Sequence, residues 1–508
     1  MKKFIIASAS LLALAAAAPA VAQNVSTLDQ SGTGNGATVT QSGSNNSDVD
    51  QNGTSNSATV SQTGTAAVSD VDQIGTSNTA TNTQTSLGGL ANVVQNGTLN
   101  RSTITQNDTA ANGAGGVAPQ DPEAFVNQQG NANLSGVSQT NTAGSLNLVA
   151  NVSQFNDGNI SSVTQSASGM GSGDLNASVL QTNGAQSMIT QTANAAAAVN
   201  QDAIVDQDGD NSSTISQTFG VNNSNTFSAT VFQRGTGNTS NISQADLGPL
   251  TPNSDFGLIA TVTQTGDGNL SNLTQTNKLQ NATILQSGDD NISNATQTGS
   301  TNTLRLTQSG DENRSTVAQS FGRSTADIVQ SGVGAQSLVN QSGREDRVFV
   351  DQLVGSDGST SSVTQTGIPH VNLNNLARIT QTGADNQSVV SQTNYRGTAT
   401  VNQSGANNIS TVSQTGTVPA AGNTANVTQT GNGNGSDVLQ QGSLNTADLL
   451  QTGSDAIADV TQTGNGNDSD ILQGGSLNTA TVAQSSNNNL SNITQTGTGG
   501  TVTVTQGF

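Results

Sequence analysis

The sequence has no cysteine, no tryptophan, one histidine and one tyrosine, and only 2% of its 508 residues are aromatic. Without cysteine, neither disulfides nor thiolate metal sites can hold the chain together. Hydrophobic residues make up 31%, so an ordinary globular core of this length is not expected, and the composition alone is typical of disorder. An ordered chain of this composition requires a repeat.

Basic residues are also scarce. Twelve Lys and Arg stand against 33 Asp and Glu, which gives a formal net charge of -21 at pH 7. This balance argues against nucleic-acid binding and against attraction to anionic membranes. Because charged residues are only 9% of the chain, the charge forms a sparse acidic coat on a neutral polar body.

Long apolar runs are confined to the first residues, "MKKFIIASASLLALAAAAPAVAQ". Two lysines precede an apolar run from Phe4 to Ala18, and small residues follow as far as Ala22. This pattern predicts a secretory signal at residues 1–22, cleaved before Gln23, and therefore a secreted chain. No later stretch approaches the ~20 apolar residues of a membrane-spanning helix, so the mature chain is not expected to span a membrane.

What the sequence has in abundance is a glutamine that returns at a step of eleven. The same step carries Gln51 to Gln106 and Gln429 to Gln506. Two and four residues before each glutamine of the central series, Gln264 to Gln352, the chain is apolar or small, and the positions between are mostly Thr, Ser, Asn or Asp. This period of two predicts a strand with one buried face. The unbroken central series is Gln264, Gln275, Gln286, Gln297, Gln308, Gln319, Gln330, Gln341 and Gln352.

Each unit also carries turn residues. Two positions after the glutamine is usually Gly, and six positions before it is often Asn. Eleven residues therefore hold one strand of about five residues and a tight turn, in which Gly and Asn tolerate positive φ. The asparagines of the central series are Asn269, Asn291, Asn302 and Asn313.

One such unit cannot bury its own face, so the units must stack. We predict an all-β fold, a parallel β-solenoid of stacked 22-residue coils with two 11-residue strand-turn units each. Identical residues then form ladders, and stacked amides hydrogen-bond along the axis. "GTSNSA" at Gly53 recurs 22 residues later as "GTSNTA" at Gly75, but "GNGNGSDVLQ" at Gly431 recurs 33 residues later as "GNGNDSDILQ" at Gly464. Three units per coil, a triangular solenoid, is therefore the alternative.

Breaks in the step divide the mature chain into blocks. Repeats at 23–106, 264–352 and 429–508 are regular, whereas 107–263 and 353–428 contain loop insertions. The long insertions are Asn107 to Asn127, Ala245 to Thr263 and Thr366 to Thr380, and Thr182 to Ser216 is the least regular stretch. The prolines after residue 22 lie where the step fails, as they should if the regular parts are ladder strands: Pro119, Pro122, Pro249, Pro252, Pro369 and Pro419. There is room for about 22 coils, a rod on the order of 100 Å long.

The repeat resembles the curlin repeat of bacterial curli, whose signature joins two strands as Ser-x5-Gln-x-Gly-x-Gly-Asn-x-Ala-x3-Gln. "QSGTGNGATVTQ", Gln30 to Gln41, matches its second half. The Ser-x5-Gln half is not distinct, and the chain has far more units than curlin subunits usually have. The resemblance implies an exported subunit of extracellular amyloid fibres in the biofilm matrix of bacteria, with self-association or other curlin-like subunits as partners and an outer-membrane export machinery.

Candidate chemistry is sparse. A catalytic Ser-His-Asp relay or a histidine metal cluster would have to be built around His370, the single histidine, which lies in an insertion. Gly-rich stretches such as that at Gly431 resemble phosphate loops, but no lysine or helix follows, so they are turns. We expect no enzyme activity and no cofactor. Outward Thr-x-Thr pairs such as Thr38 with Thr40 resemble ice-binding solenoids, but their rungs are irregular.

Acidic pairs offer one weak metal hypothesis. Asp48 and Asp50 recur as Asp70 and Asp72 one coil later, so their carboxylates would stack and repel. A cation such as Ca²⁺ could bridge them; alternatively they are a solvated acidic face that discourages aggregation. Asp437 with Asp459 and Asp448 with Asp470 repeat the arrangement.

The sequence thus predicts a secreted structural protein, a curlin-like fibre subunit that acts in biofilm matrix and adhesion by templated addition of β-strands. The regular last rung, Gly500 to Phe508, favours stacking. The alternative is a non-polymerising surface rod or adhesin whose insertions contact a target. Fibre formation discriminates between the two.

Overall fold

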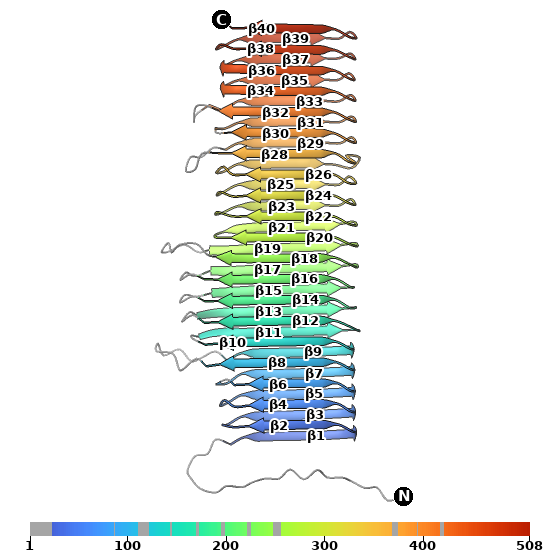
Figure 1. Ribbon diagram of the computed structural model, residues 1–508, viewed down its shortest axis with the longest axis vertical. Helices are drawn as coiled ribbons and strands as arrows, with labels where there is room; N and C mark the ends of the chain where they lie inside the picture. The colour runs from blue at the N-terminus through green and yellow to red at the C-terminus, as the bar shows by residue number, and fades with distance from the viewer. Residues whose placement is uncertain are drawn as a thin grey trace, which may run out of the picture.

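The computed structural model describes residues 23–507 except 86, 110–120, 143–144, 169–171, 195–198, 221–224, 247–255, 368–373, 394 and 417–420. The described residues form a flat rod of stacked coils (Figure 1). Forty strands alternate between two parallel sheets of 20 strands each, which we call the odd sheet and the even sheet after the strand numbers. No helix among these residues is long and apolar enough to cross a membrane. The predicted signal at 1–22 lies outside the described residues.

The odd sheet consists of β1 (Val25–Thr33), β3 (Asn46–Thr54), β5 (Val68–Thr76), β7 (Leu90–Thr98), β9 (Glu123–Asn131), β11 (Ser145–Phe155), β13 (Ser172–Thr182), β15 (Val199–Asp208), β17 (Asn225–Arg234), β19 (Phe256–Thr265), β21 (Gln280–Ser287), β23 (Thr303–Gln308), β25 (Thr325–Gln330), β27 (Arg347–Gln352), β29 (Leu376–Gln381), β31 (Thr398–Gln403), β33 (Thr424–Gln429), β35 (Thr446–Gln451), β37 (Asp468–Gln473) and β39 (Leu490–Gln495).

The even sheet consists of β2 (Gly36–Gln41), β4 (Ser57–Gln62), β6 (Thr79–Gln84), β8 (Arg101–Asp108), β10 (Leu134–Asn141), β12 (Ile160–Ala167), β14 (Gln186–Ala193), β16 (Ser212–Phe219), β18 (Thr239–Asp246), β20 (Leu270–Thr276), β22 (Ile292–Gln297), β24 (Arg314–Gln319), β26 (Gln336–Gln341), β28 (Thr360–Thr366), β30 (Gln387–Thr393), β32 (Ile409–Gly416), β34 (Gly435–Ser443), β36 (Ile457–Asn465), β38 (Thr479–Gln484) and β40 (Thr501–Gln506).

Each coil contributes one strand to each sheet, and each strand pairs in parallel with the strand one coil later. In the regular part this places Gln264 beside Gln286 and Ala260 beside Ala282, a shift of 22 residues. The prediction of two strand-turn units per coil is confirmed, and the triangular alternative is wrong. The 33-residue recurrence arises because Gly431 follows an odd strand and Gly464 ends an even one, and both edges of the rod use the same turn chemistry.

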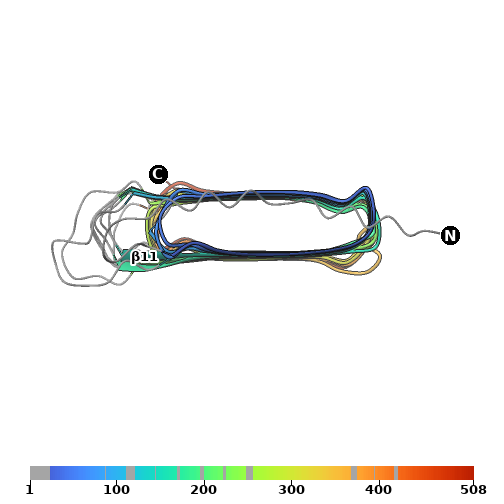
Figure 2. The same ribbon diagram turned by 90° about the horizontal axis from the view of Figure 1, so that it is seen from below.

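Between the sheets lies a thin core built from the alternating inward positions of every strand (Figure 2). In β21 the inward Ala282, Ile284 and Gln286 are fully buried, while the residues between them are half-buried or exposed. Along most of the stack, Ala or Ser, then a branched aliphatic residue, then Gln repeat in this order; Asn82 in β6 and Ala295 in β22 are exceptions at the middle position. The period-two pattern therefore places a mostly aliphatic column between small residues and amides.

Coils in the irregular block are wider than predicted. β11 and β13 have 11 residues, and successive coils there are 26 or 27 residues apart. The added residues build a second apolar cluster at one edge, which includes Leu148, Phe219 and Phe227. Because these coils use more chain, there are 20 coils and not about 22. Strands also extend into the predicted insertions, since β9 and β19 occupy their last residues.

Of the prolines on which the break argument relied, Pro122 is described. It directly precedes β9, and its carbonyl accepts a hydrogen bond from the Leu90 N–H at 2.9 Å. A proline at this edge position accepts a ladder bond without having to donate one. Pro119, Pro249, Pro252, Pro369 and Pro419 lie outside the described residues.

The ladders and the end coils as candidate functional site

The glutamines form two amide ladders that run the length of the rod, one in each sheet. In the odd sheet each Nε2 donates to the Oε1 of the next coil, at 2.6 to 3.1 Å, from Gln30 to Gln495. The even sheet does the same from Gln41 to Gln506. All of these bonds point the same way, so the ladders are polar.

The predicted ladder glutamines divide between the two sheets. Gln264, Gln286, Gln308, Gln330 and Gln352 lie in the odd sheet, and Gln275, Gln297, Gln319 and Gln341 lie in the even sheet. The second amide hydrogen of each crosses the core to a backbone carbonyl. Gln286 Nε2, for example, donates to Leu270 O at the start of β20, at 3.1 Å. A buried amide that is satisfied in this way carries little desolvation penalty and also ties the two sheets together.

The predicted asparagines hold the turns. The side chain of Asn269 links its coil to both neighbours: Oδ1 accepts from the Asn291 N–H at 3.1 Å, and Nδ2 donates to Gly288 O at 2.8 Å and to Asn238 Oδ1 at 3.0 Å. Asn269, Asn291 and Asn313 share one edge of the rod, whereas Asn302 lies at the opposite edge, where its Oδ1 accepts from the Ser324 N–H. The turn side chains thereby extend the ladder beyond the strands.

Asp346 occupies an asparagine position of these turns. It is buried, and its Oδ1 accepts from both the N–H and the Nδ2 of Asn375, at 3.3 and 3.1 Å. Burial raises the pKa of Asp346 to about 6, against a smaller lowering by the hydrogen bonds from Asn375. A carboxylate cannot donate the bond that an asparagine amide offers here.

The acidic pairs stack on the outer face of the odd sheet as the sequence suggested. Asp48 pairs with Asp70, and Asp50 pairs with Asp72, in the β3–β5 register. Burial, then Asp72, then Asp48 and Asp50 raise the pKa of Asp70, and burial followed by Asp50 and Asp48 raises that of Asp72. Within the described part of the chain, no group of three or more His, Cys, Asp or Glu is placed to hold a metal ion. A bridging cation stays a prediction.

The end coils differ from all the others in exposure. β1 is exposed along its whole length, and β40 alternates between exposed and half-buried residues. Ala37 and Val39 at one end, and Val502 and Val504 at the other, are only partly buried against the core. Each end of the described stack is therefore an edge of two sheets with an incompletely covered apolar center.

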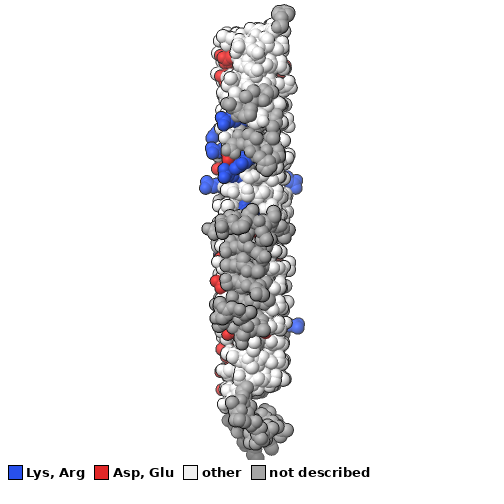
Figure 3. All heavy atoms as spheres, turned by 90° about the vertical axis from the view of Figure 1, so that its left-hand side faces the viewer, with Lys and Arg blue, Asp and Glu red and all other residues white. Residues whose placement is uncertain are grey.

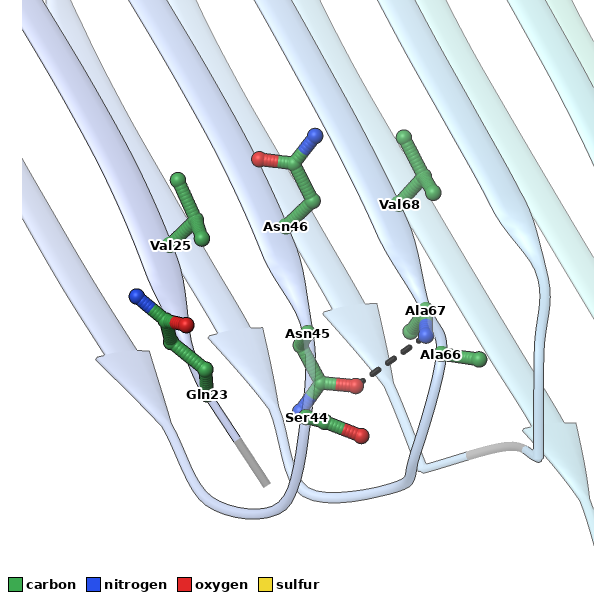
Figure 4. A pocket seen from close by; sticks show the side chains of 8 residues that line it. All are labelled: Gln23, Val25, Ser44, Asn45, Asn46, Ala66, Ala67 and Val68. Carbon is green, nitrogen blue, oxygen red and sulfur yellow. Dashed lines mark hydrogen bonds between the residues drawn. The ribbon is translucent and has the colours of Figure 1, made fainter. Parts of the chain in front are cut away.

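A shallow depression lies beside the first coils, where the even strands turn into the odd ones (Figure 4). Gln23, Val25 and Ala66 line it together with Ser44, Asn45, Asn46, Ala67 and Val68. Asn45 Oδ1 accepts the Ala67 N–H at 3.0 Å, so the turn amide is already occupied by the ladder. Its lining is neutral and consists of turn residues and the first residues of β1, β3 and β5. It contains no carboxylate, imidazole or amine beside the Ser44 hydroxyl.

The remaining candidates from the sequence are the single histidine, the Gly-rich stretches and the Thr-x-Thr pairs. His370 lies outside the described residues. Gly433 and Gly466, in the two Gly-rich stretches, have positive φ and belong to turns at opposite edges. Thr38 and Thr40 face outward from the even sheet and pair with Thr59 and Ser61 of the next coil.

Sequence reasoning missed one sorted column. Four residues before the glutamine, the odd sheet has Ala where the even sheet has Ser, as in Ala260 of β19 and Ser271 of β20. In the first and last coils the two residue types are exchanged, for example Ser47 in β3 and Ala58 in β4, and Ala458 in β36 and Ser469 in β37. The signal was visible in the sequence as an alternation of Ser and Ala every eleven residues, but "small residue" concealed it.

Comparison with known proteins gives one family. Residues 420–453, 431–464 and 464–497 each match the Curlin associated repeat. The matched region spans β33 to β39, in which the coils return at a step of 22 residues. No curated protein matches the chain.

Proposed function

We propose that this chain, a member of the curlin-repeat family, is a secreted structural subunit that joins end to end with other copies into extracellular fibres. The fold and the family are structural rather than catalytic in kind. Cleavage before Gln23, passage through an outer-membrane export machinery and a role in bacterial biofilm matrix or adhesion belong to the same proposal. N-terminal sequencing of protein recovered from the medium tests the first part, since a mature start other than Gln23 contradicts it.

The observation that carries the proposal is the polarity of the two glutamine ladders. At the last coil, each ladder glutamine donates one amide hydrogen to a backbone carbonyl: Gln495 to Thr479 O at 3.2 Å, and Gln506 to Leu490 O at 2.8 Å. Their other amide hydrogen points along the axis, where every earlier ladder glutamine donates to the next coil. At the first coil, the Oε1 atoms of Gln30 and Gln41 are the matching acceptors. A second copy that docks head to tail therefore continues both ladders.

The apolar center of each end supports the same geometry. Val502 and Val504 are half-buried at the last coil, and Ala37 and Val39 are half-buried at the first. Head-to-tail docking covers both pairs and pairs the open strand edges, which together supply hydrophobic burial and ladder hydrogen bonds. Tail-to-tail docking would set amide donors against amide donors. Each file of rods joined end to end is thus expected to be polar.

Seeded assembly of the chain from Gln23 onward tests the proposal. We expect thioflavin-positive fibres with a meridional reflection near ~4.8 Å, whose growth preformed seeds accelerate. Val504→Lys places a charge in the apolar center of the last coil and should abolish growth. Thr503→Lys, one residue away on the outer face, is the matched control and should grow like the native chain. Equal growth of both variants would contradict end-to-end docking.

The second candidate is a surface rod that does not polymerise. The observation in its favour is length: 20 coils already form a complete extended surface in a single chain. Under this alternative the native chain stays a β-rich single rod that neither seeds nor forms fibres, and it binds to a surface instead.

A further inference from the structure

The two broad faces of the rod differ in charge. On the outer face of the even sheet, the described strands carry only Arg101, Arg314, Asp437 and Asp459 as charged residues. Seen edge-on, acidic side chains line one side of the rod far more than the other (Figure 3). The odd strands carry Asp29, Asp48, Asp50, Asp70, Asp72, Glu123, Asp174, Asp202, Asp206, Asp208, Asp327, Asp351, Asp448, Asp468 and Asp470, with Arg234, Arg305, Arg347 and Arg378.

On the outer face of the even sheet, the first strands, β2 to β8, present small hydroxyl side chains, whereas later strands also present exposed apolar residues such as Leu134, Ile160 and Leu338. In its first strands two outward columns are in register from coil to coil, with Thr or Ser at every position. These residues are β-branched or small, so they make a low, even surface. Their columns contain Thr38, Thr59, Thr81 and Thr103, and Thr40, Ser61, Thr83 and Thr105.

The face is also flat. Viewed along the axis, the coils superimpose with little rotation from one to the next (Figure 2). Flat sheets of many strands are unusual and are typically stabilised by stacking against another sheet. Twenty strands of at least six residues span about 95 Å by 20 Å, roughly 1,900 Å² for each copy. A stable interface needs about 800 Å² on each partner.

We propose that two copies of this chain pair side by side through their even sheets, with the rods antiparallel. Charge selects the face, because a chain of net charge -21 repels a copy most strongly across its acidic odd sheet. The even sheet is the face on which that repulsion is smallest. This pairing does not depend on end-to-end joining, and it leaves both acidic odd sheets in solvent.

The four charged residues on the outer face of the even sheet decide whether the two rods pair parallel or antiparallel. In a parallel twofold pair each coil faces its own copy, so Asp437 and Asp459 would meet the same two carboxylates of the partner. In an antiparallel pair with full overlap, the fourth strand from one end faces the fourth strand from the other. These strands are β8, which begins with Arg101, and β34, which carries Asp437. The twofold axis therefore forms the Arg101–Asp437 contact twice.

The surface around Asp437 is acidic and would be stabilised by a nearby cation. Asp437 and Asp459 are adjacent in register, and burial together with Asp437 raises the pKa of Asp459. The guanidinium of Arg101 is exposed at the start of β8, and a long side chain can reach across a gap of about 10 Å between stacked sheets when it points toward the neighbouring column. In each copy, Arg101 and Asp437 both lie on the outer face of the even sheet.

Charge exchange tests the pairing. The chain from Gln23 onward is measured by sedimentation equilibrium and by small-angle scattering, in which a side-by-side pair doubles the mass but keeps the maximum dimension of one rod. Arg101→Glu or Asp437→Arg alone should weaken pairing about tenfold or more, and the double exchange should restore it. Asp448→Arg, on the odd sheet, is the matched control and should not weaken pairing. Failure of the double exchange to restore pairing overturns the proposal.

Cross-linking tests the direction, because the chain has no cysteine of its own. An antiparallel pair places Thr83 of β6 opposite Thr461 of β36, the third strands from the two ends. Mixed Thr83→Cys and Thr461→Cys chains should therefore be joined by a bismaleimide of about 10 Å. Joining of Thr83→Cys with Thr79→Cys instead indicates a parallel pair and overturns the proposal. A chain that stays single at every concentration also overturns the proposal.

Fibre growth separates this proposal from the preceding one. Val504→Lys should remove end-to-end growth and leave side-by-side pairs intact. Arg101→Glu should leave growth from seeds intact while the fibres become thinner. A loss of pairing in Val504→Lys would mean that the doubled mass came from the ends, and would overturn the lateral interface alone.

Discussion

At the scale of single residues, the core contains two kinds of buried polar side chain with opposite consequences. Gln319 accepts from Gln297 Nε2 at 2.8 Å and donates to Gln341 Oε1 at 2.8 Å and to Thr303 O at 3.2 Å. Ser315, four residues earlier in β24, is buried, and its hydroxyl has no hydrogen-bond partner. The glutamine is part of a network, whereas the serine is a small filler.

This difference predicts the outcome of two alanine substitutions. Gln319→Ala leaves an amide, an amide oxygen and a carbonyl unpaired in the core, so we expect a local loss of about 3 kcal/mol or more. Ser315→Ala removes a hydroxyl without a partner and should change stability by less than about 1 kcal/mol, or increase it. Hydrogen exchange of the amides in β22, β24 and β26 measures both. Equal loss of protection in the two variants would mean that the ladder contributes nothing beyond packing.

The buried carboxyl group of Asp346 predicts an unusual pH dependence of folding stability. Its pKa in the folded chain is about 6, raised by burial from the 3.8 of an ordinary aspartate. The folded state thus binds the proton more tightly than the unfolded state, so this group's contribution to stability falls as pH rises from about 4 to about 6. The loss is about 3 kcal/mol at neutral pH.

Asp346→Asn should remove this dependence, because an amide accepts from Asn375 as the carboxylate does and carries no charge. We expect the turn between β26 and β27 to exchange its amide hydrogens more slowly in the variant at pH 7, and at the native rate at pH 4. Glu345→Gln, the preceding residue in the same turn, serves as the control for a general change of charge. A native-like pH profile in Asp346→Asn would assign the dependence to another group.

At the scale of elements, the wide coils show how residues added to the eleven-residue repeat lengthen the strands and pack into an apolar cluster. β16 and β17 are lengthened so that Phe219 and Phe227 meet edge to face at 5.8 Å, and both rings are buried. Leu148, Leu175 and Leu258 of the neighbouring odd strands continue the same cluster along the axis. A chain that is almost free of aromatic residues therefore places two of them in the wide coils.

The cluster predicts a local packing effect. Phe219→Ala removes a fully buried ring and should destabilise the coils around β16 by about 3 to 5 kcal/mol, with little effect on coils far along the rod. Phe321→Ala is the matched control, because Phe321 lies in a turn with 37% of its surface exposed. Protease susceptibility of the 199–265 segment measures the change. Uniform destabilisation of the rod would show that the coils unfold as one unit.

At the scale of the whole molecule, each coil contacts only its two neighbours, so stability is the sum of the coils and their interfaces. The end coils have one neighbour among the described residues and exposed inner faces. We expect amide protection to be lowest in β1, β2, β39 and β40 and to rise within a few coils toward the middle. Assembled fibres should lose this gradient, since docking gives the end coils a second neighbour. A gradient that persists in fibres would indicate lateral association alone.

Much of this architecture could be predicted from the residues. The step of eleven and the period of two predicted the strands and their parallel stacking. They also predicted the amide ladders, because a buried glutamine that recurs at each coil can be satisfied only by its own copies. Coil size could not be settled, because Gly431 and Gly464 show that both edges accept the same turn. The added width of β11 to β19 was also missed, since Leu148 and Phe227 lie outside the eleven-residue pattern.

By itself, the sequence determined the unit: which side chains face inward, where the turns fall and why no cysteine or aromatic core is needed. These are local consequences of spacing and side-chain chemistry. Only the tertiary structure decided which units share a sheet, since that depends on how the coil closes. Closure placed Asp48 and Asp72 on one broad face and Thr38 and Thr59 on the other, aligned every glutamine bond in one direction, and so gave the rod two unlike faces and two unlike ends.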